Sequence, residues 1–196
     1  MSYNTPSPSR SRSARHIEGG SSPSSSAKTL ALVVSLLVLV LAIIRAFCPF
    51  SLHPFALYPA CPPSNHFAYH FFHAGLMHAL INVWCFVSIV FLYDIRLRHL
   101  GLAFLIAVFM PDLITSGDTV GLSAVCFALM AIAATQVARP YVIHAYVALV
   151  IAVMWAAPYL FAMLGLPSAH AANAVHACAY VTALIVERIW KRYSIS

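Results

Sequence analysis

A serine and a histidine stand inside strongly apolar stretches of this chain. Ser123 follows Gly121 at the start of one such stretch, and His176 lies within another, more than fifty residues later. Polar side chains at membrane depth are costly to keep there, so each calls for a reason. A hydroxyl beside an imidazole makes a nucleophile and its base, and the pair is a candidate for peptide-bond hydrolysis.

Each of the two residues also has a structural interpretation. Serine is a preferred N-cap residue, and a lone histidine in a helix bundle is commonly a hydrogen-bonded structural group. A serine near a helix N-terminus, however, also lies where free N–H groups and the helix dipole favour an oxyanion. Ala179 and Ala183 continue the helical face of His176. Small residues let a neighbouring helix approach closely, so we expect His176 within hydrogen-bond reach of Ser123.

A third group of polar residues follows the first apolar segment. His78 and Asn82 are four residues apart, so they share one helical face and can donate to a single oxyanion. His73 and His78 are alternative metal ligands, but their spacing separates them by about 140° around a helix. No acidic residue lies nearby. We therefore expect neither a metal nor a cofactor at these residues.

The composition excludes an ordinary soluble domain. Of 196 residues, 62% are hydrophobic and 8% charged, and the mean hydropathy is +0.86. A bilayer-spanning helix needs about 20 apolar residues. Six apolar segments are long enough to cross or nearly cross a bilayer: 29–47, 71–93, 98–115, 121–138, 141–165 and 169–190. The predicted fold class is all-α, a polytopic bundle of six transmembrane helices.

Two regions are expected from this pattern. Residues 1–28 are rich in Ser, Pro and Arg and predict a disordered cytosolic tail. An organellar transit peptide is the alternative, but the stretch lacks the apolar face that an amphipathic presequence needs. Residues 29–192 form the membrane domain.

The positive charges predict the orientation of the segments. They cluster at one set of segment ends, and the opposite loops carry only acids among their charged residues. The cationic positions are Arg10, Arg12, Arg15, Lys28, Arg96, Arg98, Arg139, Arg188, Lys191 and Arg192. By the positive-inside rule both termini are cytoplasmic, in a membrane that the sequence does not specify. Arg45 is the exception, and we expect it to snorkel toward the headgroups. The net charge of +6 thus reflects topology and not a nucleic-acid partner.

The five cysteines give little support to a cross-link or a metal. Cys48 and Cys61 bracket a proline-rich loop and can form a disulfide if that loop faces an oxidising compartment. The chain has no CxxC pair, so the sequence does not support a structural zinc site.

Together these motifs resemble those of the rhomboid intramembrane serine proteases. The HxxxxHxxxN pattern falls on His73, His78 and Asn82, GxSxxxxAL runs from 121 to 129, and ANxxH runs from 172 to 176. Asp94 and Arg96 resemble the acid-x-arginine signature of the family. The order and spacing of the motifs carry the resemblance, which covers residues 71–183.

The resemblance implies a role for each site residue. Ser123 would be the nucleophile and His176 the general base, with no third carboxylate. His78, Asn82 and the Ser123 N–H would form the oxyanion hole. The residues implied to line the site are His73, Gly121, Phe127 and Trp155, with Phe127 packing on the histidine where the family often has tyrosine. The implied partners are membrane lipid and single-pass transmembrane substrates that enter beside the second and fifth segments.

Two other functions stay open at this point. A catalytically inactive rhomboid-like protein would bind membrane-protein clients without cleaving them. A small transporter or channel would use intramembrane histidines as a proton relay, which leaves the Gly121-Leu122-Ser123 motif without a role and lacks an obvious internal repeat.

Overall fold

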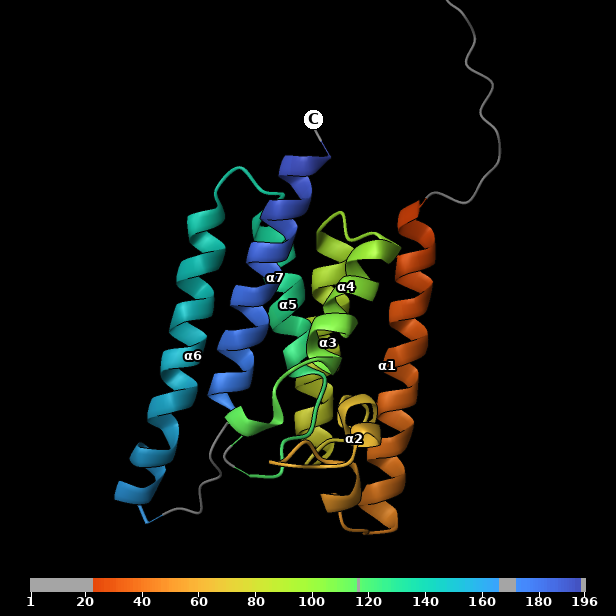
Figure 1. Cartoon of the computed structure of the whole chain (residues 1–196). Helices are drawn as coiled ribbons and strands as arrows, with labels where there is room; N and C mark the ends of the chain where they lie inside the picture. The colour runs from red at the N-terminus through yellow and green to blue at the C-terminus, as the bar shows by residue number, and fades with distance from the viewer. Residues whose placement is uncertain (1–22, 116, 166–171, 195–196) are drawn as a thin grey trace, which may run out of the picture.

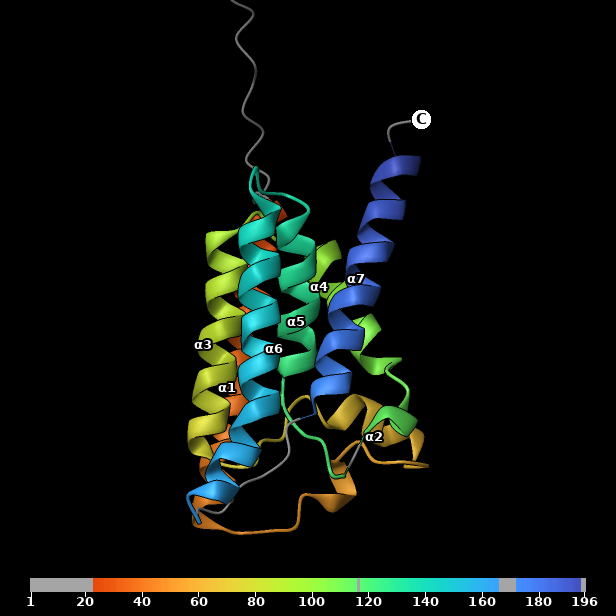
Figure 2. The same cartoon turned by 90° about the vertical axis from the view of Figure 1, so that its left-hand side faces the viewer.

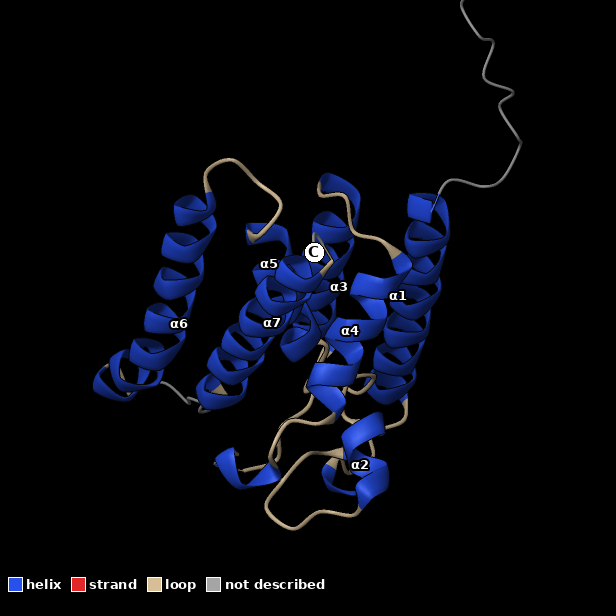
Figure 3. Ribbon diagram, turned by 45° about the horizontal axis from the view of Figure 1, so that its top comes forward, coloured by secondary structure: helices blue, strands red, loops and turns tan. Residues whose placement is uncertain are grey.

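The computed structural model describes residues 23–115, 117–165 and 172–194. Their regular structure is helical, with one isolated β-bridge between Leu57 and Thr119 (Figure 3). The all-α fold class is therefore confirmed. The long helices are α1 (Pro23–Phe47), α3 (Leu76–Leu92), α4 (Leu97–Val108), α5 (Ser123–Ala134), α6 (Pro140–Met163) and α7 (Asn173–Tyr193). Three short elements are α2 (Pro63–Ala68) and the 3-10 turns η1 (His53–Phe55) and η2 (Asp112–Ile114).

The long helices run side by side, and the short elements gather at one end of the bundle (Figure 1). The start of α1 and the end of α7 lie at the opposite end. After a quarter turn, α6 stands in front of the bundle, with α3 and α7 on either side of it (Figure 2). We call the end with the short elements and irregular segments the loop end. The helix α1 begins, and α7 ends, at the opposite end of the bundle.

Each of the six expected segments overlaps one of the long helices, but the bounds of the helices differ from the expected ones. In the segment 98–115 the helix ends at Val108, and Pro111 is the residue before the turn η2. The short helix α2 was not foreseen, because its residues lie in the proline-rich loop. Most of the expected tail, residues 1–22, lies outside the described residues. Residues 23–28 are helical and belong to α1, so the expected boundary at residue 28 is wrong.

The helix α5 is the centre of the bundle. Nine of its 12 residues are buried, and it packs against α3, α4, α6 and α7. Six of those nine are alanines or a cysteine, so neighbouring backbones come close. At 1.5 Å per residue α5 is about 18 Å long, well short of the roughly 30 Å of a bilayer core. The helix begins at Ser123 and the next three residues are buried, so the first turn of α5 lies inside the bundle.

Two helices are long and apolar enough to cross a membrane, Ser25–Phe47 and Pro140–Met163. Only 28% and 11% of their apolar windows are buried, whereas a core helix of a soluble protein is mostly buried. Three further helices, α3, α4 and α5, are apolar but shorter. The structure therefore supports association with a membrane.

Arg45, which we expected to snorkel toward the headgroups, has hydrogen-bond partners within the protein. Its guanidinium donates to the backbone carbonyls of His73 and Ala74, just before α3. These bonds tie the end of α1 to the segment that leads into α3, and so the single cation that breaks the charge pattern has a structural partner.

Polar contacts also join the helices at the other end of the bundle. Glu187 of α7 is buried, with its carboxylate 3.9 Å from the Arg98 guanidinium and 3.8 Å from the His99 ring. Lys191 donates to the Thr135 carbonyl at 2.6 Å, which joins α7 to the end of α5. The packing of α7 on α5 is thus held at one end by hydrogen bonds and along its length by small residues.

We predict that Ala183→Leu destabilises the bundle, because Ala183 is fully buried where α7 faces the core. Overpacking of this kind costs about 1–3 kcal/mol. The matched control is Ala152→Leu on an exposed face of α6, which should change stability by less than about 0.5 kcal/mol. Thermal unfolding in detergent measures both, and equal melting temperatures for the two variants would contradict the packing described here.

Candidate catalytic site

Ser123 and His176 are hydrogen-bonded to each other. The Ser123 hydroxyl lies 2.7 Å from Nε2 of His176, although the residues belong to α5 and α7. Ser123 is the first residue of α5, and the N-cap position is taken by Leu122 without any side-chain capping bond. The interpretation of Ser123 as a helix cap is therefore wrong. The pair has the geometry in which an imidazole can take the serine proton.

The ring of His176 is held by stacking. It is 4% exposed, and the ring of Phe127 lies parallel to it at 4.7 Å. Its Nδ1 has no hydrogen-bond partner among the described residues, so no carboxylate orients this imidazole there. In the tautomer with the proton on Nδ1, Nε2 is free to accept the Ser123 proton. The pair is a dyad, since no third polar residue among those described hydrogen-bonds to Nδ1 of His176. The stacked ring of Phe127 holds the orientation of the imidazole instead.

The turn before Ser123 depends on a glycine. Gly121 has φ +123°, a backbone conformation that L side chains rarely adopt. A Cβ at this position would lie 3.1 Å from Cε1 of His78 and 3.4 Å from Nδ2 of Asn82. The absence of a side chain thus lets both candidate oxyanion donors approach the backbone beside Ser123.

Two hydrogen bonds fix this turn to the segment before α3. The N–H of Leu122 donates to Nε2 of His73 at 3.3 Å, and the N–H of Gly121 donates to the Tyr69 carbonyl at 2.8 Å. His73 is 2% exposed. It therefore holds the backbone that presents Ser123, and it does not line the open cavity as the sequence suggested.

His78 and Asn82 have donors available beside Ser123. The N–H of Ala74 donates to Nδ1 of His78 at 3.4 Å, which leaves the proton on Nε2. Asn82 uses one amide hydrogen on the His78 carbonyl at 3.1 Å and keeps the other. The Ser123 N–H lies in the first turn of α5, where N–H groups have no intrahelical acceptor. These donors can together stabilise the charge that develops on a carbonyl oxygen attacked by Ser123.

A cavity of about 440 Å³ opens onto the dyad. Its polar wall is formed mainly by Ser123, His176, His78 and Asn82. Away from them it runs between α3 and α6, along largely apolar side chains: Ile81, Trp84, Cys85, Ile89, Leu92, Cys126, Phe127, Met130, Val150 and Met154. The cavity is a largely apolar groove with one reactive polar patch.

One residue that we expected to line the site, and the two residues of the acid-x-arginine signature, lie outside the cavity. Trp155 is 63% exposed, packs on Tyr159 at 5.4 Å and is not part of the cavity wall. Asp94 and Arg96 form an ion pair at 3.2 Å beyond the end of α3. The Arg96 N–H also donates to His99 at the start of α4, so this motif shapes the connection between the two helices.

Other contacts were not foreseen from the sequence. His144 of α6 is hydrogen-bonded to the Tyr180 hydroxyl of α7, which links the outlying helix α6 to the centre. Cys126 donates to the Asn82 carbonyl at 3.7 Å. His70 is buried against Tyr69, and burial lowers its pKa to about 3, so this ring is a neutral packing group. Cys48 and Cys61 are both free. The His144–Tyr180 and Cys126–Asn82 bonds each join two different helices. The sequence shows how residues are spaced along one helix, but it does not show such contacts between helices.

No protein-family model matches this chain, and no curated protein matches it either. The chemistry of the site is therefore inferred from its own geometry.

We predict that Gly121→Ala disturbs the site and lowers stability. The added Cβ must displace His78 by a few tenths of an ångström, and the positive φ adds about 1–3 kcal/mol of backbone strain. A melting temperature lower by several degrees follows, since 1 kcal/mol corresponds to about 2–4 °C at this size. Gly101→Ala in α4, where a Cβ meets nothing within 4 Å, is the control and should not destabilise. If both variants melt like the wild type, the close approach at Gly121 is incorrect.

Proposed function

We propose that this protein is a rhomboid-like intramembrane serine endopeptidase that cleaves transmembrane-helix substrates near the outer face. The observation that carries the proposal is the 2.7 Å contact between Ser123 Oγ and His176 Nε2 at the polar patch of an apolar groove. The motifs at His73, His78 and Asn82 that resemble the rhomboid family lie beside it.

The reaction follows from the positions of these groups. Ser123 Oγ attacks the substrate carbonyl while its proton passes to Nε2 of His176, and the carbonyl oxygen takes up the negative charge. His78, Asn82 and the Ser123 N–H donate to that oxygen. His176 then gives the proton to the leaving amine, the C–N bond breaks, and an acyl-enzyme remains. Water attacks the ester with His176 again as base, which releases the acid and restores Ser123.

The cavity suits a substrate that arrives from the side. It lies between α3 and α6, the two helices of the segments beside which we expected entry. Its largely apolar wall matches the side chains of a membrane helix, and the donors of Ser123, His78 and Asn82 gather where the bond would be cut. Locally unwound substrate backbone costs less there than in lipid, because exposed N–H and C=O groups in lipid have no partners.

The proposal includes a topology of six membrane-embedded helices, α1, α3, α4, α5, α6 and α7. The charges and the position of both helix ends at one end of the bundle support cytoplasmic termini (Figure 1). The short α5 is surrounded by other helices, so it need not span the bilayer by itself. The first turn of α5 is buried, so Ser123 lies inside the bundle on the side of the loop end. The irregular loops at that end can admit water to it.

We expect purified protein in detergent or liposomes to cleave a fluorescent single-pass substrate, and Ser123→Ala or His176→Ala to reduce the rate by about 10³-fold or more. Ser88→Ala is the matched control, because Ser88 lines the same cavity without a histidine partner. A fluorophosphonate probe should label wild type and Ser88→Ala but not Ser123→Ala.

Equal cleavage by wild type and the two dyad variants, over several substrates, would overturn the protease proposal. Binding of the substrates without any cleavage would favour the inactive, client-binding alternative instead.

We predict that Asn82→Ala lowers kcat by about 10²–10³-fold with little change in KM, because its amide donates chiefly to the transition-state oxyanion. Ile81→Ala removes a neighbouring side chain of the same cavity that has no donor, and it should affect KM more than kcat. Steady-state kinetics on the two variants separate the effects. A kcat unchanged in Asn82→Ala removes this residue from the oxyanion hole.

A further inference from the structure

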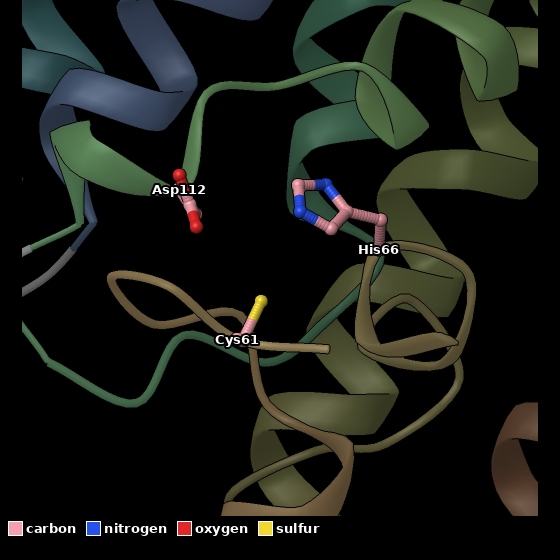
Figure 4. Close-up of side chains that lie close together, drawn as sticks. All are labelled: Cys61, His66 and Asp112. Carbon is pink, nitrogen blue, oxygen red and sulfur yellow. The ribbon is translucent and has the colours of Figure 1, made fainter. Parts of the chain in front are cut away.

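Three potential metal ligands meet at the loop end of the bundle, apart from the dyad. Cys61 precedes α2, His66 lies in α2, and Asp112 begins η2. Their ligand atoms all lie within 4.8 Å of one another (Figure 4). They line a separate cavity of about 380 Å³ that shares no residue with the cavity at Ser123.

The His66 ring is already oriented as a ligand. Its Nδ1 lies 3.0 Å from the backbone carbonyl of Val108 and donates to it, which fixes the tautomer and leaves the lone pair on Nε2. Figure 4 shows the other ring nitrogen directed toward the space between Cys61 and Asp112. Metal-bound histidines commonly donate their second N–H to a carbonyl in this way.

Asp112 is held in place as well. Its Oδ2 accepts from the Ala60 N–H at 2.7 Å, and its second oxygen is left for another partner. Ala60 has φ +62°, which places Cys61 directly after a left-handed turn. The hydrogen bond from the Ala60 N–H therefore fixes the orientation of the Asp112 carboxylate and also the position of the neighbouring Cys61.

Cys61 is a buried residue of the hydrophobic core, and its thiol has no covalent or hydrogen-bonded partner among the described residues. It is 8% exposed, free of any disulfide, and its sulfur makes no hydrogen bond among the described residues. A buried thiol beside an imidazole and a carboxylate is a suitable soft donor for a metal.

We propose that Cys61, His66 and Asp112 bind a Zn²⁺ ion. Thiolate, imidazole and carboxylate together are ligands that Zn²⁺ accepts, at about 2.0–2.3 Å in tetrahedral geometry, with water in the fourth position. Ligand atoms then lie roughly 3.5 Å apart, so modest side-chain rotations close the site. Binding releases the Cys61 proton to water, and the thiolate and carboxylate balance the two charges of the ion.

The ion would add a further link between two parts of the chain that already share the His66–Val108, Ala60–Asp112 and Leu57–Thr119 hydrogen bonds. One is the loop with α2, and the other is η2 after α4, which continues toward Thr119 and the Ser123 turn. A zinc site there stabilises the loop end around the groove without taking part in the dyad chemistry. The spacing of these residues did not indicate the site, because the ligands follow no CxxC pattern and Asp112 is distant in the chain.

The test is a Co²⁺ titration of untagged, chelator-stripped full-length protein in detergent, with Zn²⁺ competition. We expect one Co²⁺ per chain, the visible bands of a tetrahedral ion, a thiolate charge-transfer band, and displacement by Zn²⁺. Cys61→Ser should lose the charge-transfer band. His66→Gln and Asp112→Asn should weaken binding by at least about tenfold, as even outer-shell changes do. Asp112→Asn keeps an acceptor for Ala60, so it is the variant least disturbed in its fold.

Cys48→Ser and His53→Gln are the controls. Cys48 is an exposed free cysteine, and His53 pairs with Asp118 at 2.9 Å without any thiol. Both variants should bind like the wild type. Zn²⁺ should also raise the melting temperature of the wild type but not of Asp112→Asn. Absence of the charge-transfer band in the wild type, or its persistence in Cys61→Ser, overturns the proposal.

Discussion

The close packing of α7 on α5 sets the distance on which the site depends. Ser123 begins α5, and His176 lies in the first turn of α7. The distance between their side chains therefore depends on how closely the two helix backbones approach each other. Ala179 and Ala183 are fully buried on α7, and the facing helix is itself rich in alanine. A larger side chain in this contact would push the helices apart and break the 2.7 Å hydrogen bond. Small residues therefore serve the chemistry by allowing two helices to come close.

The second constraint is the turn that leads into α5. Gly121 leaves room for His78 and Asn82, while His73 and the Tyr69 carbonyl hold the backbone from behind. One histidine, His73, thus holds the backbone before Ser123, and another, His78, lines the cavity beside it. Because a buried polar group without a partner is costly, each of these bonds also favours a single conformation of the turn.

The position of α5 explains how polar chemistry fits in an apolar bundle. A helix of 12 residues cannot cross a bilayer alone, but four neighbours bury it. Its N-terminus can then lie within the protein, where unpaired N–H groups face a cavity instead of lipid. Cys61, His66 and Asp112 gather at the loop end and line a cavity separate from that of Ser123.

The sequence by itself determined the helical class and the approximate positions of the long helices, because apolar runs and charges depend on local order. It also singled out Ser123, His176, His78 and Asn82, since polar residues within the apolar segments are few. Only the tertiary structure decided that His73 lies behind the turn, that Trp155 is outside the groove, and that Asp112 meets Cys61. These facts depend on where separate helices and loops meet, and spacing along one chain does not contain that information. The end of α4 at Val108 was likewise set by the turn that follows it, not by hydropathy.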